Sequence, residues 1–349
     1  MRINLMVEPQ EGMTYAELLA LARRAEMLGF EALYRSDHYA SVFDREGVGS
    51  TDAWATLAGL ARDTQRIMLG TLVSPATFRP PAQLAKVTVT VADMAGTVPE
   101  MPVDLLGSAP SRPAAGASRV HLGVGTGWLA SEHLQYGFPF GDLSTRFRRL
   151  EELLQVIRGL WDPAQDPFSF EGQFERLVEA RFRPTPNPRP RIIVGGRGRT
   201  KTMRLAVTYA DELNIPSATL LECKGLRDAL HAACERYGRD PSTITFSLMT
   251  GCLVGATERE FRARAAQLEK LASGYPRLAD YCQRLAVRGV IGTPEEAADH
   301  LGLLAEAGVE RIMLQHLLHD DLEMLDLIAQ EVVPRLDPNR PIRVSGMHQ

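Results

Sequence analysis

The sequence lacks the features that mark several classes of protein. It has four cysteines, separated by 11, 18 and 30 positions: Cys223, Cys234, Cys252 and Cys282. This spacing matches neither a CxxC pair nor a set of zinc ligands, so we expect reduced, buried thiols and no metal site. No apolar run reaches the ~18 residues that a membrane helix needs, and Glu8 and Glu11 would interrupt the apolar core of a signal peptide. These absences predict a cytoplasmic protein.

An excess of charge of one sign is also missing. The 39 basic and 43 acidic residues give a net charge of −4. Such a balance provides no field that would hold a phosphate backbone, so nucleic acid is not expected as a partner. With 45% hydrophobic and 23% charged residues among 349, the composition is that of a globular protein with a large core. Length alone does not distinguish two domains from one α/β barrel.

Short apolar runs alternate with stretches of helical period along the chain, which is typical of βα units with parallel strands. The eight predicted strands cover residues 3–7, 31–36, 67–73, 120–125, 191–194, 212–215, 244–254 and 311–314. The predicted helices that follow them cover 15–28, 53–62, 82–94, 147–160, 200–209, 221–237, 258–272 and 322–333. A further helix is expected after Thr293-Pro294, a good N-cap followed by a residue that fits the first helical position. Eight units without a central reversal favour an α/β fold of the (β/α)8 TIM-like barrel type, with insertions, over a doubly wound sheet.

Two segments interrupt this alternation. Residues 97–118 are rich in Pro, Ala, Ser and Gly, and we expect an atypical surface insertion there, on the N-terminal face of the barrel and remote from catalysis. Residues 163–190 contain Phe170-Glu171-Gly172-Gln173-Phe174, whose central Glu-Gly resembles a hairpin turn, so a hairpin-containing insertion is expected. The chain is therefore predicted to form a single barrel over residues 1–336, with a C-terminal tail at 337–349.

The second predicted strand runs directly into Asp37 and His38. In a barrel of this type, ligand chemistry takes place where strands end and βα loops begin. An imidazole titrates near neutral pH and can pass a proton in either direction. His38 is therefore the candidate catalytic residue, and the alternative is a histidine that only hydrogen-bonds a neighbouring strand.

Glycines and cations follow the fifth predicted strand, in the run Gly195-Gly196-Arg197-Gly198-Arg199. Exposed backbone N–H groups and the dipole of the next helix bind phosphate, and arginine adds bidentate contacts. The run therefore predicts an anion site. It is not a Walker loop, because Thr200 stands where that motif needs glycine. The alternative is a glycine-rich turn with solvated arginines.

The fourth predicted strand ends in Gly123-Val124-Gly125-Thr126-Gly127-Trp128. This is GxGxGW rather than the GxGxxG of a dinucleotide site, and it lacks the acidic residue ~20 positions later, which argues against a Rossmann fold. That alternative would require strong NADH binding near these glycines. Small residues here would let a flat ring approach the backbone. Trp128 would then wall that pocket or fill the core.

Taken together, these strand ends resemble the luciferase-like monooxygenase superfamily, in particular its coenzyme F420-dependent branch. The resemblance covers nearly all of the chain outside residues 97–118. The motifs that carry it are Ser36-Asp37-His38, Arg66–Val73, Gly125–Trp128 with Glu132-His133, Tyr136–Pro139, Ile193–Gly196 and Ile291–Glu295. The resemblance implies a TIM-like barrel that holds a flavin or a deazaflavin across the strand ends.

The resemblance also implies a role for each matching position. Asp37 and His38 would face the cofactor ring, with His38 as the proton donor or acceptor. Val73 and Ser74 would belong to a non-proline cis peptide, within residues 72–74, behind the ring. The middle of the cofactor would be lined by Thr126, Gly127 and Ser131. Its phosphate would be held by Gly195, Gly196, Arg197, Gly198 and Arg199.

The implied activity is that of an F420-dependent oxidoreductase, in which a hydride passes between F420 and a small organic substrate while His38 handles the proton. An FMN-dependent monooxygenase of the same fold is the alternative, and a non-catalytic cofactor-binding protein is a further one. In the branch that oxidises sugar phosphates, a catalytic glutamate occupies the place of Trp128. A larger, apolar substrate is therefore favoured, although its identity and the direction of transfer stay open. The resemblance also implies a homodimer.

Overall fold

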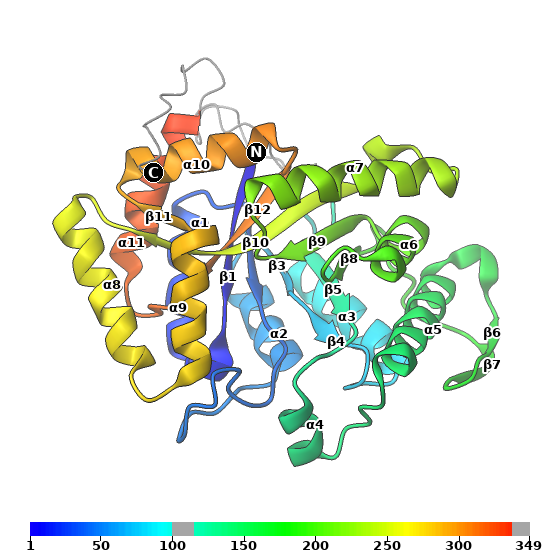
Figure 1. Ribbon diagram of the computed structural model, residues 1–349. Helices are drawn as coiled ribbons and strands as arrows, with labels where there is room; N and C mark the ends of the chain where they lie inside the picture. The colour runs from blue at the N-terminus through cyan, green and yellow to red at the C-terminus, as the bar shows by residue number, and fades with distance from the viewer. Residues whose placement is uncertain (100–114, 337–349) are drawn as a thin grey trace.

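The computed structural model describes residues 1–99 and 115–336. Eight parallel strands form a closed barrel (Figure 1): β1 (Arg2–Val7), β2 (Ala32–Arg35), β3 (Met68–Thr71), β5 (Val120–Gly125), β8 (Arg191–Gly195), β9 (Glu212–Pro216), β10 (Thr245–Val254) and β12 (Arg311–His316). Each strand pairs with the next one named, and β12 pairs back onto β1. The predicted (β/α)8 barrel is confirmed.

Helices surround the barrel (Figure 1): α1 (Tyr15–Met27), α2 (Ala53–Asp63), α3 (Pro81–Ala95), α5 (Leu143–Trp161), α6 (Thr200–Tyr209), α7 (Leu220–Arg236), α8 (Glu258–Ala272), α10 (Pro294–Glu306) and α11 (Leu322–Leu327). The start of α10 follows from its sequence, because Thr293 and Glu296 form a capping box. The helix expected after Thr293 is thus confirmed. The last predicted helix differs, since α11 passes into a π-helical turn at Ile328–Val332 and a 3₁₀ turn at Val333–Leu336.

Four further helices and strands were not predicted from the sequence: β4 (Ser74–Pro75), α4 (Ala130–Tyr136), α9 (Pro276–Arg288) and β11 (Val290–Gly292). The strands β4 and β11 extend the sheet by pairing with β5 and β10, and they are too short to show any period. Helix α9 buries only Leu278 and Leu285, so its apolar stripe is sparse. The strands β4 and β11 pair with the C-terminal residues of β5 and β10, and α4 lies at the bottom of Figure 1.

A two-stranded antiparallel sheet lies between α5 and β8, formed by β6 (Phe168–Glu171) and β7 (Arg176–Ala180). Its turn is attached to α5, because the carboxylate of Glu152 accepts the backbone N–H groups of residues 173–175. Residues 97 and 118 form an antiparallel bridge. The rest of the predicted insertion between 100 and 114, and the predicted tail at 337–349, lie outside the described residues.

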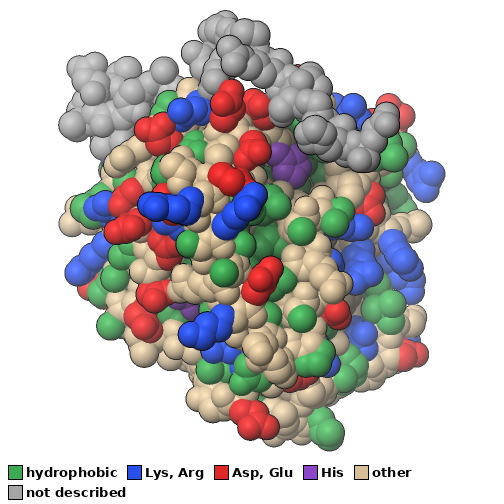
Figure 2. Space-filling view, turned by 60° about the vertical axis from the view of Figure 1, so that its left-hand side comes forward, with side chains coloured by type: hydrophobic (Ala, Val, Ile, Leu, Met, Phe, Trp, Pro, Cys, Tyr) green, Lys and Arg blue, Asp and Glu red, His purple; other side chains and the backbone are tan. Residues whose placement is uncertain are grey.

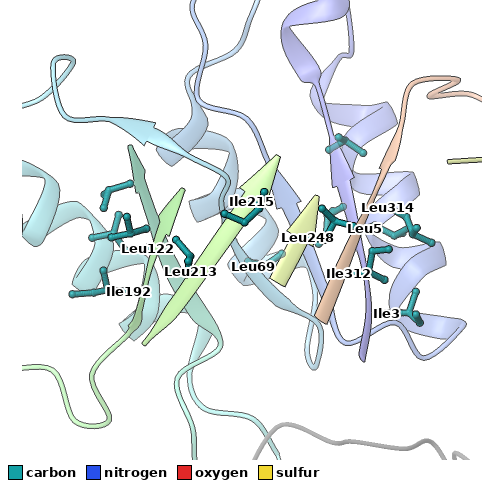
Figure 3. Close-up of a cluster of buried hydrophobic side chains, with 14 of the residues drawn as sticks. Ile3, Leu5, Leu69, Leu122, Ile192, Leu213, Ile215, Leu248, Ile312 and Leu314 are labelled. Carbon is teal, nitrogen blue, oxygen red and sulfur yellow. The ribbon is translucent and has the colours of Figure 1, made fainter. Parts of the chain in front are cut away.

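The main core lies between the barrel wall and the helices. Apolar side chains alternate along the strands, and Figure 3 shows ten that belong to this cluster: Ile3, Leu5, Leu69, Leu122, Ile192, Leu213, Ile215, Leu248, Ile312 and Leu314. Inside the barrel, the buried guanidinium of Arg311 donates to Glu212 at 2.7 Å and to the Tyr34 hydroxyl at 2.7 Å. A buried cation is tolerated only when paired in this way. Because Arg311 begins β12, this paired layer fills the N-terminal part of the interior.

The charge distribution agrees with the composition, and three of the four cysteines are buried as expected, whereas Cys282 is not. Acidic and basic side chains are interspersed over the face shown in Figure 2. All four cysteines are free, three of them buried and Cys282 half-buried. Within residues 1–99 and 115–336, no helix combines the length and the apolar character that a membrane span requires.

His316 at the end of β12 provides a test of this packing. Its side chain is fully buried, and neither ring nitrogen has a hydrogen-bond partner among the described residues. Burial, assisted by nearby His319, lowers the pKa of His316 to about 3. The unfolded chain binds a proton near pH 6.5 and the folded chain does not. The stability that neutral His316 contributes is therefore complete above pH 6.5 and is lost as the pH falls from there toward 3.

We expect the wild type to lose about 2 kcal/mol of unfolding free energy through His316 between pH 6.5 and pH 5. His316→Leu removes the titrating group, so its loss over this interval should be smaller by that amount in urea unfolding followed by circular dichroism. His231→Leu on α7 is the matched control and should behave as the wild type. Equal losses in the wild type and the His316 variant would contradict this account.

Candidate active site

His38 and Glu132 meet at the C-terminal end of the barrel, although 94 positions separate them. His38 follows β2, and Glu132 lies on α4, which follows β5. The Nδ1 atom of His38 lies 2.9 Å from Oε1 of Glu132, and the backbone N–H of Tyr39 donates to Oε2 of the same carboxylate at 3.0 Å. Glu132 is fully buried, while the His38 side chain is 12% exposed. The carboxylate thus orients the imidazole and leaves Nε2 available to a ligand.

The surroundings of His38 also set its charge. Burial of the imidazole lowers its pKa, but the hydrogen bond and the charge of Glu132, together with the charges of Glu8 and Asp37, outweigh burial and raise the pKa of His38. The protonated form is therefore more populated near neutral pH than in a free histidine. Such a group can donate a proton at neutral pH and accept one at higher pH.

Asp37 is buried and faces a network of protein groups. Its carboxylate accepts hydrogen bonds from Ser74 Oγ at 2.6 Å and from the two terminal nitrogens of Arg79 at 2.6 and 3.3 Å. Arg79 also donates to Asp52 at 2.7 Å, so this cation lies between two carboxylates. The network joins the loop after β2 to the loop after β3. Asp37 thereby fixes Ser74 beside the site.

The peptide bond between Leu72 and Val73 is cis and does not precede proline, so the predicted position of such a bond within residues 72–74 is confirmed. Most of the glycines around Val73 leave space that its side chain occupies. A β-carbon on Gly125 or Gly195 would come within 2.7 Å of a Val73 methyl group, and one on Gly123 would come within 2.1 Å of the Thr71 carbonyl oxygen. The expectation that small residues in this run let a flat ring approach the backbone stays a prediction, and the structure gives Gly123 and Gly125 a second reason to be glycine. These glycines make room for the protein's own strand and for Val73.

The predicted anion site lies where β8 ends and α6 begins. Gly195 is the last residue of β8 and lies against Val73, which places the glycine run next to the loop after β3. Arg199 is the N-cap of α6 and makes no capping hydrogen bond, so no side chain caps the first N–H groups of this helix. Arg197 and Arg199 are exposed, and neither forms an ion pair with the described residues. Unpaired guanidinium groups beside an uncapped helix start suit an anion.

Gly198 shapes this turn. Its φ of +65° lies in the left-handed region, and a β-carbon there would come within 2.6 Å of Leu226 and 3.0 Å of Ile215. Gly196 donates its backbone N–H to the Asn214 carbonyl at 3.0 Å. The turn between β8 and α6 therefore requires glycine at position 198, and its start is hydrogen-bonded to β9.

The remaining predicted positions follow β5. The hydroxyl of Thr126 donates to the Gly127 carbonyl at 3.3 Å. Ser131 is exposed on α4. Trp128 is 59% exposed, and its ring meets the His38 ring edge-on with centroids 5.9 Å apart. Of the two alternatives for Trp128, the structure supports a wall of the site and not a place in the core.

Three residues near His38 and Asp37 were not predicted from the sequence: Glu8, Arg79 and Gln315. Glu8 follows β1, and its carboxylate accepts hydrogen bonds from the Gln315 side chain at 2.5 Å and the Gln10 side chain at 2.6 Å. A carboxylate directly after the first predicted strand was a usable signal. Gln315 carried none, because only barrel closure brings residues 8 and 315 together. No cluster of three potential metal ligands occurs in the described part of the chain.

Comparison with known proteins agrees with this geometry. The chain is 30% identical to the F420-dependent hydroxymycolic acid dehydrogenase of Mycobacterium tuberculosis (strain ATCC 25618 / H37Rv) over 258 residues, 74% of this chain and 64% of that protein. The match thus spans less than two thirds of that relative. The F420-dependent glucose-6-phosphate dehydrogenase of Microbacterium testaceum (strain StLB037) is 25% identical over 343 residues, 92% of this chain and 93% of that protein.

The fold has a counterpart among solved structures. An F420-dependent secondary alcohol dehydrogenase in complex with an F420-acetone adduct superposes with a TM-score of 0.77 at 20% identity, covering 96% of this chain and 98% of that one. The luciferase-like monooxygenase family model matches residues 2–96 and 117–311, which include β1 and the loops after β2, β5 and β8. The chain therefore belongs to the luciferase-like monooxygenase family.

Proposed function

We propose that this protein is an F420-dependent oxidoreductase, in which a hydride passes between F420 and a small organic substrate and His38 gives or takes the accompanying proton. The observation that carries the proposal is the link between two parts of one site. Asp37, next to His38, binds Ser74, and Val73, next to Ser74, packs against Gly195 at the start of the anion run. The candidate proton carrier and the residues proposed to bind an anion thus lie at the same end of the barrel.

The residues present fit such a cofactor. Arg197, Arg199 and the uncapped start of α6 would hold its phosphate, with Gly195, Gly196 and Gly198 forming the turn. Thr126, Gly127 and Ser131 would line its middle, and Val73 and Ser74 would lie behind its ring. When bound, F420 supplies a carrier of two electrons in the form of a hydride.

The chain itself supplies the proton transfer. In the oxidative direction, the C–H bond of the substrate breaks with its electron pair and the O–H proton passes to Nε2 of His38, since Nδ1 is engaged by Glu132. In the reductive direction, the raised pKa of His38 favours the protonated imidazole that donates to the new alkoxide oxygen. FMN is the cofactor of the alternative function, a flavin-dependent monooxygenase. Because the family is described as luciferase-like monooxygenases, F420 and FMN are both tested as cofactors.

Separate titrations of the purified protein with F420 and FMN test the choice of cofactor. We expect F420 to bind more tightly, measured by quenching of its fluorescence. His38→Asn should retain the F420 dissociation constant within about threefold while the rate of hydride transfer falls by about 10²–10⁴. His231→Asn on α7 is the matched control and should keep full activity. Tight binding of FMN alone would overturn the proposal.

The anion site gives a second prediction. Arg199→Ala would remove the charge-assisted hydrogen bond proposed for the phosphate, so the dissociation constant of F420 should rise about tenfold or more. The effect of the substitution should shrink as salt is added, because salt screens exposed charges. Arg236→Ala, at the exposed end of α7, is the control for loss of a surface arginine. Unchanged F420 affinity in the Arg199 variant would place the phosphate elsewhere.

Glu132→Gln tests the origin of the raised pKa. Glutamine keeps an oxygen for the Tyr39 N–H but removes the negative charge, so the pKa of His38 should fall. The shift can be followed directly by NMR of the imidazole C–H signals and, in turnover, as a move to lower pH of the transition that limits proton donation. Glu306→Gln at the exposed end of α10 should leave both unchanged. A pKa that stays constant in the Glu132 variant would contradict the assignment.

A further inference from the structure

Glu132, which orients His38, lies on a short helix with few anchors. Helix α4, all of which lies within the described residues, has seven residues and buries two of them, Glu132 and His133. Leu129, the residue before the helix, is buried in a cluster with residues of the loop after β2 and of α9. A helix of this length is not stable by itself, so the contacts of its buried side chains determine where α4 lies.

The His133 ring is buried, and both of its nitrogens have partners. Nδ1 lies 2.7 Å from the Leu129 carbonyl oxygen, and Nε2 lies 2.7 Å from Oγ1 of Thr77. Because a carbonyl oxygen only accepts, Nδ1 carries the proton in the neutral ring and Nε2 accepts from the Thr77 hydroxyl. Thr77 is 4% exposed and His133 1%. Loss of the hydroxyl would therefore leave a buried acceptor without its partner, which is costly.

This hydrogen bond completes a set of three that joins the segments 37–38, 74–77 and 132–133 pairwise. The three bonded pairs, at 2.6, 2.9 and 2.7 Å, are Asp37–Ser74, His38–Glu132 and His133–Thr77. Each segment is therefore bonded to both of the others. Segment 74–77 is also bonded to the barrel, because β4 pairs with β5 and the backbone N–H of residue 76 donates to the carbonyl of residue 125 at 2.8 Å. Thr77 thus ties α4 to the barrel wall.

The charged groups that face His38 make the position of Glu132 important for proton transfer. Burial lowers the pKa of His38, and the hydrogen bond and charge of Glu132 are the largest influences that raise it. Glu8 and Asp37 raise the pKa less, and the charge of Asp37 is offset by its ion pair with Arg79. A movement of Glu132 away from Nδ1 would therefore weaken the largest influence that favours the protonated imidazole.

We propose that Thr77 and His133 are positioning residues, which hold Glu132 against the proton carrier His38. This inference rests on the proposed function, because it assigns two further residues to the orientation of its proton carrier. Both side chains are buried, so they act through Glu132 and not by contact with a substrate. When the bond between them is lost, α4 loses its tie to the barrel wall and Glu132 no longer holds Nδ1 of His38 in place.

The first test follows the His38 imidazole by NMR in the protein without added cofactor, so it does not depend on turnover. Thr77→Val removes the hydroxyl at nearly constant size. We expect it to raise the proton dissociation constant of His38 about threefold or more, since Glu132 then stabilises the protonated imidazole less. Thr77→Ser keeps the hydroxyl and should restore the wild-type transition. Thr88→Val is the matched control, because Thr88 is also buried and its hydroxyl donates to the Leu84 carbonyl within α3.

A double-mutant comparison tests the route of the effect. In the Glu132→Gln background the charge is already absent, so adding Thr77→Val should leave the His38 transition unchanged. His133→Phe breaks the same hydrogen bond from the other side and should shift the transition in the same direction as Thr77→Val. An unchanged transition in the Thr77→Val variant, or an equal shift with and without the Glu132 carboxylate, would overturn the inference.

Titration with F420 separates positioning from cofactor binding. Thr77→Val should keep the F420 dissociation constant within about threefold of the wild-type value, because the buried hydroxyl is not part of the anion site. Weaker F420 binding with an unchanged His38 transition would assign Thr77 to the cofactor site instead and would overturn the inference. If the wild type fails to bind F420, the proposed function is overturned, while the NMR comparison still decides whether Thr77 and His133 position Glu132.

Discussion

The parallel pairing of β12 with β1 is the constraint on which this site depends. It closes the barrel, so that all eight strands end at one rim and residues distant in the sequence become neighbours. Glu8 and Gln315 are hydrogen-bonded across this closure, and the charge of Glu8 acts on His38. Paired charges around Arg311 fill the N-terminal part of the interior. The opposite end remains as the place where ligands can meet the loops.

Different side chains of the loops at that rim orient His38, hold Asp37 and join the loops. Glu132 orients His38 and favours its protonated form, while Arg79 holds Asp37 and thereby Ser74. Val73 fills the space that Gly125 and Gly195 leave free, which joins the loop after β3 to the anion run. Each of these contacts links loops that follow different strands. These contacts therefore hold the loops of the site to one another.

The sequence predicted most of the fold, because apolar periodicity is a local property and all eight barrel strands carried it. It failed for α9, whose buried stripe consists of Leu278 and Leu285, and for β4 and β11, which are too short to have a period. At the site, His38 and the run from Gly195 to Arg199 were recognisable from their place after strands. The roles of Arg79 and Gln315 were not, because they depend on contacts with residues 37 and 8.

By itself, then, the sequence determined where strands and helices form and which residue types follow each strand, because these depend on neighbours along the chain. It also carried the family motifs around residues 36–38 and 193–196. Only the tertiary structure decided that Glu132 binds His38, that the glycines of β5 accommodate Val73, and that Trp128 lies exposed beside the imidazole. These facts are set by barrel closure and loop packing, which bring together groups that no local pattern connects.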